Sequence, residues 1–409
     1  MHHEHTAPTD IDLPRTSLWA KLPLIGGVLA VVGLGATLAM ALGEHRERAM
    51  FSYLWAFYAC LSIALGAWAW VMIEHLARSG WSAAIRRVGE TAAVTLPLFA
   101  LLWIPIATLG YHSLYPWSHE TDAILEKKRW FLGDGFFFGR AIFYFALWSV
   151  FSYLLYRWST RQDSEPSLEG RTALTHKMWR LSAPGILLFA LTSSFAAIDW
   201  LMSLQPHWYS TIFGVYLFAR SILSFYAFTI LVVMGLQKAG VLKSVTAEHF
   251  HDLGKYTFGF TVFWAYIAFS QFVLIWYANI PEETEFYLVR MHGGWQWISY
   301  ALPILNFALP FFFLLSRQIK RRRVLLAVAA IWTLLVHLVD LYWLILPNYG
   351  MHHGGGHAEP HLAVSWMDFA ALFGMVGVFL AVFSFLLARK KVMAVNDPRI
   401  FESLAHENY

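Results

Sequence analysis

Long apolar stretches alternate with short polar segments along almost the whole chain. Each stretch reaches about 20 residues, the length that an α-helix needs to cross the hydrocarbon core of a bilayer. Lipid offers no partner to free backbone groups, so a chain crosses it as helices whose N–H and C=O groups bond within each segment. The pattern predicts ten spans at residues 22–43, 51–73, 89–111, 136–156, 181–203, 212–236, 256–278, 294–316, 324–346 and 365–388.

The predicted fold class is therefore an all-α, polytopic membrane protein with ten transmembrane helices. Composition agrees, because 58% of the 409 residues are hydrophobic and only 14% are charged, which is untypical of a soluble domain. The segment before the first span is polar and contains Glu4, Asp10 and Asp12, unlike the basic flank of a cleavable signal. We expect the first span to remain in the protein.

Positive charge is distributed unevenly between the two sets of connecting segments. The N-terminus, the C-terminus and the loops on their side carry 22 Lys and Arg residues, against 6 in the opposite loops. The positive-inside rule then predicts a multi-pass protein with both termini in the cytoplasm. The basic clusters 317–323 and 389–391 are expected to contact anionic lipid, with no role for nucleic acid.

A weak internal repeat suggests how the helices are grouped. The fifth span ends with Asp199-Trp200 and the ninth with Asp340-Leu341-Tyr342-Trp343, and four spans separate the two aspartates. Such parallel repeats are common in membrane proteins. We predict two four-helix bundles plus two peripheral helices. The corresponding domains are 1–50 with the N-terminus and first helix, 51–203, 204–346, and 347–409 with a His-rich loop, the last helix and the C-terminus.

Ionisable and hydroxyl side chains inside the spans are the candidate functional residues. Charges in hydrocarbon are costly and are kept where they pair or line a polar path. The orientation places five ionisable groups from five spans in the outer half of the membrane, and the helical period puts further polar groups on their faces. The polar side chains inside the spans therefore form either a proton-transfer route or structural ion pairs. The candidates are Asp199, Asp340, His337, Arg140, Arg220, Asp368, Thr192 and Thr333.

The half of the membrane near the termini offers few candidates from sequence. Glu74 and His75 end the second span and are interpreted as ordinary interface residues. Prolines interrupt the third span at Pro97 and Pro105, and another pair flanks Asn306 in the eighth span. Such breaks either adjoin hydrated cavities or only adjust packing.

Cysteine and histidine usage argues against a redox centre on this chain. Cys60 is the single cysteine, which excludes iron–sulfur clusters and covalent c-type haem. Among the histidines only His337 lies well inside a span, so the bundle has no bis-histidine haem site. A metal site among His352, His353, His357 and His361 is disfavoured, because a Gly-rich loop gives no fixed geometry. We therefore predict no bound cofactor or metal and no catalytic residue.

Three segments carry a resemblance to a known family: FAAIDWLMSLQPHWYSTIFGVYLFA, NFALPFFFLLSRQIKRRR and VHLVDLYWLILP. They resemble the NrfD-like (polysulfide-reductase C-like) membrane subunits, most closely the ActF type of alternative complex III, the bacterial quinol:cytochrome c oxidoreductase. The resemblance implies a subunit of the bacterial inner membrane beside a larger NrfD-like paralogue, a multihaem cytochrome c and an iron–sulfur subunit. It also implies that menaquinol oxidation belongs to the paralogue, while this chain conducts protons in a respiratory or photosynthetic electron transport chain.

Two other classes of function remain open from the residues alone. Ten spans with broken helices also suit a stand-alone, proton-coupled secondary transporter. A structural anchor that only holds electron-transfer partners is the other alternative. For the subunit interpretation, small residues in the first span, Gly26, Gly27, Gly33 and Gly35, are expected to contact a neighbouring membrane subunit.

Overall fold

The computed structural model describes residues 10–349 and 361–408, and within these ranges the chain is helical with no β-strand. Ten helical segments are long and apolar enough to cross a membrane, which confirms the predicted all-α, polytopic class. The spans are α1 (Leu18–Ala41), α2 (Arg46–Leu76), α3 (Arg86–Ala93) with α4 (Leu96–Thr108), α7 (Asp134–Gln162), α8 (Leu168–Trp200), α9 (Phe213–Lys238), α10 (Ala247–Ala278), α12 (Trp295–Leu302) with α13 (Leu309–Leu315), α15 (Arg323–Ile345) and α16 (Trp366–Ala388).

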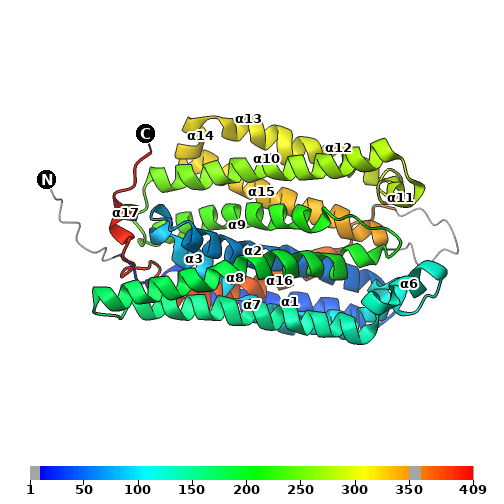
Figure 1. Ribbon diagram of the computed structural model, residues 1–409, viewed down its shortest axis with the longest axis horizontal. Coiled ribbons are helices and arrows are strands. Elements are labelled where there is room, and N and C mark those ends of the chain that lie inside the picture. Colours follow the sequence, from blue (N-terminus) through cyan, green and yellow to red (C-terminus); the bar gives the residue numbers. More distant parts are fainter. Residues whose placement is uncertain (1–9, 350–360, 409) are drawn as a thin grey trace.

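Short elements connect the spans at both ends of the bundle. Residues 10–17 and 392–408 lie at one end, here named the terminal end, together with α14 (Arg317–Arg321) and α17 (Ile400–Leu404) (Figure 1). The opposite end, named the loop end, holds α5 (Tyr111–Leu114), α6 (Ala123–Leu132) and α11 (Pro281–Val289). Single 3-10 turns complete the set at Trp81–Ala84, Pro116–Ser118, Met202–Leu204 and Leu346–Asn348.

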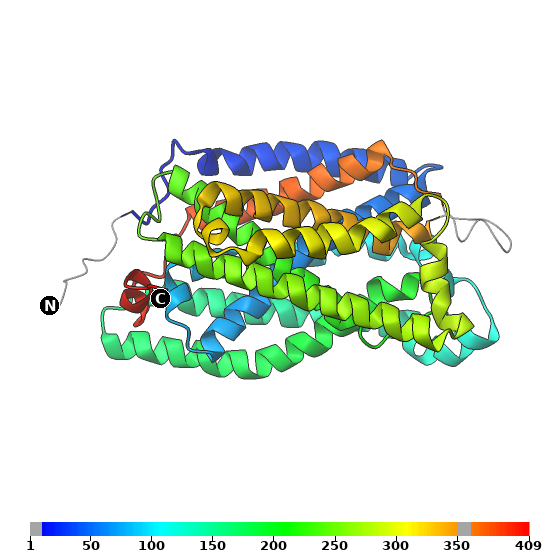
Figure 2. The same ribbon diagram turned by 90° about the horizontal axis from the view of Figure 1, so that it is seen from above.

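The helices form two groups around a central pair. In one group α2 packs against α3, α4 and α8, and α7 packs against α4 and α8. In the other, α9 packs against α10 and α15, and α10 packs against α13. Figure 1 shows α2 and α9 in the middle of the molecule, and α1 packs mainly on α16 at its side (Figure 2). The helix grouping is that of two four-helix bundles with two outer helices, while the exact domain boundaries stay a prediction.

Burial separates the central helices from the peripheral ones. In the most apolar window of each helix, 89% of the residues of α2 and 83% of those of α9 are buried, against 22% in α1. The two central helices approach closely because Gly66 of α2 lies directly against the backbone carbonyl of Ser221 in α9. A side chain at position 66 would overlap that carbonyl, so the contact depends on glycine.

The two spans with paired prolines, the third and the eighth, are interrupted, as the sequence indicated, whereas α1 and α8 continue through Pro23 and Pro184. The third span breaks at Val94 and Thr95, after which Pro97 sits in the first turn of α4. The eighth contains a π-helical turn, η4 (Pro303–Ala308), between α12 and α13. The indole nitrogen of Trp332 donates to the Leu305 carbonyl inside this turn at 2.8 Å. A side chain thus satisfies one backbone group within the irregular turn, as lipid surroundings require.

The glycines of α1 do not form one outward-facing contact surface. Gly26 and Gly33 pack against the backbone of α16, at Gly377 and Ala370, so they hold two helices of the same chain together. Gly27 and Gly35 face open space instead. The expectation that all four glycines serve a neighbouring subunit was therefore wrong for Gly26 and Gly33, because a helix presents only every third or fourth residue to one partner.

This arrangement predicts opposite outcomes for two equal substitutions. Gly33→Leu should overpack the contact between α1 and α16 and cost about 1–3 kcal/mol of stability. Gly27→Leu adds the same side chain in open space and should leave stability unchanged. Thermal unfolding of the two variants in mild detergent measures the difference, and equal melting temperatures would contradict the helix pairing described here.

Candidate functional site

Three aspartates at the loop end share one pattern of contacts. Each carboxylate is bound by one arginine and by one tyrosine hydroxyl, and each aspartate is at most 2% exposed. The five ionisable residues predicted from five spans therefore do not form one network. They belong to three separate ion pairs, and the third pair includes an arginine that the sequence analysis did not single out.

Asp199 forms the most complete of these sites. Arg140 reaches its two carboxylate oxygens with Nε and Nη2 at 2.8 and 2.7 Å, and the Tyr144 hydroxyl donates at 2.9 Å. The third guanidinium nitrogen donates to the Phe131 carbonyl at 2.8 Å. Thr192 lies two turns away and accepts a 2.9 Å hydrogen bond from the Trp148 indole. A two-pronged pair of this kind fixes both partners in place.

Asp340 is bound less completely. The Tyr216 hydroxyl donates to Oδ1 at 2.5 Å, and Arg220 Nε lies 2.9 Å from Oδ2. Arg220 Nη1 donates to the side-chain oxygen of Asn306 at 2.7 Å. Asn306 belongs to the π-helical turn η4, so the interruption of the eighth span supplies a partner to a buried arginine. Turns of this type often occur at functional sites.

His337 lies one turn before Asp340 and contacts α2. Its Nε2 atom is 3.0 Å from the Ser62 hydroxyl and 3.2 Å from the Ala59 carbonyl. Thr333 lies one turn before His337 on the same helix, and its hydroxyl donates to the backbone carbonyl of Ala329 in that helix. His337 therefore connects the Asp340 region to the central helix, whereas Thr333 shows only a local contact.

Asp368 combines its ion pair with a helix cap. Arg48 Nη2 binds it at 2.6 Å, and the hydroxyls of Ser52 and Tyr342 donate to it at 2.8 and 3.0 Å. The same carboxylate accepts from the Ser365 backbone N–H at 2.8 Å and closes a capping box at the start of α16. Arg48 was missed because it stands at the polar edge of its span. Its i, i+4 spacing to Ser52 was the available signal.

Among the three loop-end sites, the Asp340 site is the one with unpaired polar atoms. Within the described residues, Arg220 Nη2, Asn306 Nδ2 and His337 Nδ1 are buried and have no hydrogen-bond partner. The carboxylates and guanidinium groups of the Asp199 and Asp368 sites have no such atoms. Buried polar groups are nearly always satisfied, commonly by internal water. The Asp340 site is thus the one of the three with groups to hold water.

An apolar cavity of about 630 Å³ adjoins this site. Tyr216, which binds Asp340, forms part of its wall, and the other lining residues come mainly from α10, α12 and η4. The polar groups among the lining residues are uncharged, namely Tyr216, Trp264, Tyr266, Gln271, Tyr287, Ser299, Tyr300 and Trp343. Tyr266, Phe269 and Tyr300 in the wall are 59–65% exposed, so the cavity opens toward the lipid-facing surface.

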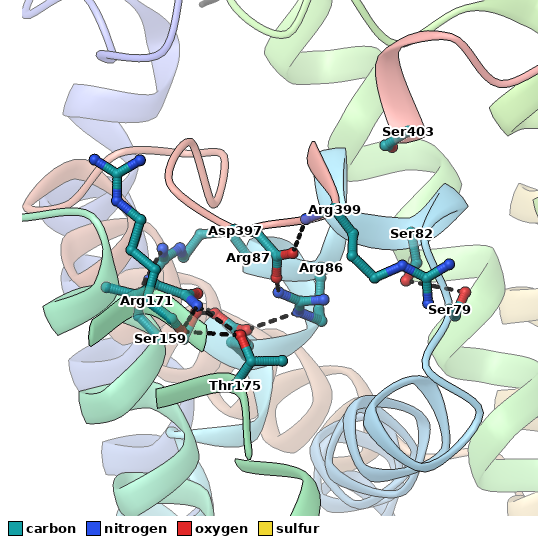
Figure 3. A network of polar contacts seen from close by, with 12 residues as sticks. Ser79, Ser82, Arg86, Arg87, Ser159, Arg171, Thr175, Asp397, Arg399 and Ser403 are labelled. Carbon is teal, nitrogen blue, oxygen red and sulfur yellow. Dashed lines mark hydrogen bonds and ion pairs between the residues drawn. The ribbon is translucent and has the colours of Figure 1, made fainter. Parts of the chain in front are cut away.

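The terminal end contains a second set of buried charges that sequence reasoning missed. Arg86 binds Glu90 at 3.2 Å and also pairs with Asp397 of the C-terminal segment. Arg87 binds Asp163 at 2.7 Å, and the Ser159 hydroxyl donates to Glu90 at 2.7 Å. Figure 3 shows Arg86, Arg87, Ser159 and Asp397 of this set close together. The two arginines had been counted only as loop charges that orient the protein.

Glu74 and His75 were expected at the interface with water, but the structure buries both side chains. They are only 4% and 5% exposed, because the C-terminal segment and the 3-10 turn at 81–84 cover the end of α2. The expectation of few polar groups near the termini was therefore wrong, since segments distant in sequence fold over this end and bury its charges.

Two aspartates of this cluster lie outside the spans and have opposite pKa shifts. Burial raises the pKa of Asp163 to about 6, although the nearby Arg87 acts in the other direction. Burial also acts to raise the pKa of Asp397, but the Arg86 guanidinium outweighs it and holds that pKa below the usual range. One carboxyl group thus retains a proton more readily than usual, and the other remains ionised.

The His-rich loop, at which a metal site was disfavoured from sequence, lies largely outside the described residues, which include His361 but not His352, His353 and His357. Elsewhere in the described ranges no group of three or more His, Cys, Asp or Glu residues is placed to hold a metal ion. A comparison with protein-family models finds no match, and neither does a comparison with curated proteins. Function is therefore argued from the geometry of the two charged ends.

The opposite pKa shifts predict opposite pH dependences of stability. Asp163 binds its proton more tightly in the folded chain, so its contribution is full below about pH 4 and is lost as pH rises toward 6. Asp397 has a lowered pKa, so it stabilises the fold fully above about pH 4 and loses its effect as pH falls below that value. Thermal unfolding between about pH 2.5 and about pH 7.5 should show the first slope disappear in Asp163→Asn and the second in Asp397→Asn. The same slopes in both variants would contradict this assignment.

Proposed function

We propose that the chain is a proton-conducting subunit of a quinol-oxidising membrane complex of the NrfD-like type, without a redox centre of its own. The proposal combines the ten-span architecture with the likeness of three sequence segments to that family. The partners are an NrfD-like paralogue, a multihaem cytochrome c and an iron–sulfur subunit, in a bacterial cytoplasmic membrane. Lipids surround the outer helices.

The observation that supports proton conduction best is the Asp340 site. Its carboxylate is fully buried, and its arginine partner is 1% exposed. The surrounding unpaired groups of Arg220, Asn306 and His337 suit bound water. A carboxyl group in low dielectric beside one positive charge can gain or lose a proton when the surrounding charge changes. The saturated contacts of Asp199 make it a structural pair by comparison.

Buried polar groups continue from Asp340 along the central helices. His337 contacts Ser62 of α2, and Thr229 of α9 is fully buried with an unpaired hydroxyl among the described residues. Glu74 lies near the end of α2, about 18 Å from Ser62 by helical rise. Waters between these groups would complete a route from the loop end to the charges of the terminal end.

Purification in mild detergent tests membership of a complex. A subunit of a quinol-oxidising assembly should copurify with haem absorbance that this chain has no ligands to produce. A secondary transporter would be isolated alone or as a homo-oligomer. A purely structural anchor would copurify with haem but would show no effect of the proton-site substitutions described next.

Asp340→Asn should lower proton coupling per assembled complex, while Arg220 keeps its hydrogen bond to Asn306. The amide has the same shape and keeps a hydrogen-bonding oxygen for Tyr216, but it cannot exchange a proton. We expect proton release or uptake coupled to quinol oxidation to fall by about tenfold or more, measured as pH change in liposomes. His337→Phe, which removes the adjacent ring nitrogens, should reduce coupling in the same direction.

Asp199→Asn provides the contrast. Removing one charge of a buried, two-pronged pair leaves Arg140 unpaired and costs about 3–5 kcal/mol. We therefore expect complex yield to fall before coupling per complex does. Glu285→Gln, on the exposed surface of α11, is the neutral control. Normal yield and normal coupling in Asp340→Asn would overturn the proton-conducting role.

A second candidate function is quinone binding in the 630 Å³ cavity. Its uncharged polar groups and apolar walls fit a neutral ring with an isoprenoid tail, and it opens toward lipid. At one end Gln271 accepts from Ser210 at 3.2 Å and donates to Tyr287 at 3.4 Å, so amide and phenol groups are available to ring carbonyls. Tyr216 in the wall would connect such a ligand to Asp340.

Extraction of the purified chain with organic solvent measures how much quinone is bound to it. Menaquinone should be recovered from the wild type and at a reduced level from Gln271→Leu, which removes the polar end of the cavity. Gln318→Leu makes the same change at an exposed position of α14 and should not alter recovery. Equal quinone in all three proteins would assign the quinone to lipid carried along with the chain.

A further inference from the structure

A polar cavity of about 380 Å³ opens at the terminal end, beside the buried charges. It lies where α7 and α16 end, and the side chain of Asp163 in its wall is 10% exposed. The other lining residues are Asp12, Leu13, Thr160, Ser164, Ala388, Arg389, Lys390 and Lys391. Asp163 is therefore in contact with the cavity on one side and with the buried Arg87 on the other.

Charges alternate from this cavity into the protein. Asp163 binds Arg87 at 2.7 Å, and Arg87 lies 3.6 Å from Glu90, whose side chain is fully buried. Glu90 binds Arg86 at 3.2 Å, and Arg86 pairs with Asp397. Each carboxylate in this series lies close to a guanidinium group. A proton can therefore move from one carboxyl group to the next without leaving an unpaired buried charge.

A hydroxyl group is bonded to the second carboxylate, Glu90. Ser159 lies four residues before Asp163, which directly follows the end of α7, so the two residues stand about one helical turn apart on the same side of α7. Its hydroxyl donates to Glu90 Oε2 at 2.7 Å. A hydroxyl both donates and accepts, so it can relay a proton between a group near the cavity and a buried one.

The charge balance of the cluster favours a stored proton. Arg86 and Arg87 face three carboxyl groups, Glu90, Asp163 and Asp397, and the buried Glu74 lies close enough to interact with Arg86. The buried part of the cluster thus holds two guanidinium groups against four carboxyl groups. Lys390 and Lys391 add positive charge beside Asp163 on the cavity side, so the excess negative charge lies deeper in the cluster, where low dielectric favours its relief by protonation.

We propose that Asp163 is the group through which protons enter this chain from the terminal side, with Ser159 and Glu90 as the next two positions. This inference rests on the proposed proton-conducting function and gives it a defined point of access. The proton moves from cavity water to the Asp163 carboxylate, and then through the Ser159 hydroxyl to Glu90 as Asp163 is again ionised.

Passive proton flux through the purified complex in liposomes tests the inference. A potassium diffusion potential drives protons inward, and a trapped pH dye reports the rate in complexes whose terminal side faces outward. Asp163→Asn should slow uptake by about tenfold or more. Asp163→Glu keeps a carboxyl group and should retain most of the rate. Asp12→Asn changes an exposed carboxylate of the same cavity and should have no effect.

Two further measurements separate a missing relay from a damaged fold. Ser159→Ala keeps the pair of Asp163 and Arg87 but removes the hydroxyl, so it should slow uptake with an unchanged melting temperature. Infrared titration of the wild type should show a protonated carboxyl band that is absent in Asp163→Asn.

The outcomes distinguish this inference from the proposed function on which it rests. Slow uptake in Asp340→Asn with normal uptake in Asp163→Asn and Ser159→Ala would overturn the access site and leave the function standing. Normal uptake in all three variants would overturn proton conduction itself.

Discussion

Each of the three buried aspartates at the loop end meets a guanidinium group, because an unpaired charge in low dielectric is far more costly than a paired one. Asp199 joins α8 to α7, Asp340 joins α15 to α9, and Asp368 joins α16 to α2. Each pair therefore fixes the rotation and depth of two helices at once. Apolar packing alone specifies these weakly, since lipid is as apolar as the helix surfaces.

The two repeat-related aspartates show how one position supports different chemistry. Asp199 takes its arginine from the preceding helix, with Tyr144 one turn after Arg140, and all of its charged atoms are bonded. Asp340 takes Arg220 from α9, and part of that guanidinium turns away to Asn306. Asp199 and Asp340 occupy corresponding positions in the repeat, but their arginine partners do not. The Asp199 site is consequently saturated, and the Asp340 site keeps unpaired polar groups for water beside a cavity.

The fold was largely predictable from sequence, whereas the pairing was not. Ten apolar windows are local information, and each appears as a helix within a few residues of its predicted bounds, except where α8 and α10 extend beyond the apolar window. The three buried aspartates at the loop end could also be identified from single spans. Their partners could not, because a pair depends on helix rotation and on neighbours far away in sequence. Arg48 and the cluster around Arg86 were missed for the same reason, since both stand at polar helix ends that other segments later cover.

The proposed proton route follows polar groups along the central helices α2 and α9. Their packing bears on whether cations other than protons could pass. The helices α2 and α9 are the most buried, and Gly66 brings their backbones into contact between the two charged ends. About 18 Å separates Ser62 from Glu74 along α2, and buried aromatic and aliphatic side chains such as Trp68 and Leu65 fill that interval. A hydrated metal ion cannot pass such packing, but a proton needs only a transient file of water between hydroxyl groups. In the proposed proton route, the close contact of the central helices would favour protons over other cations.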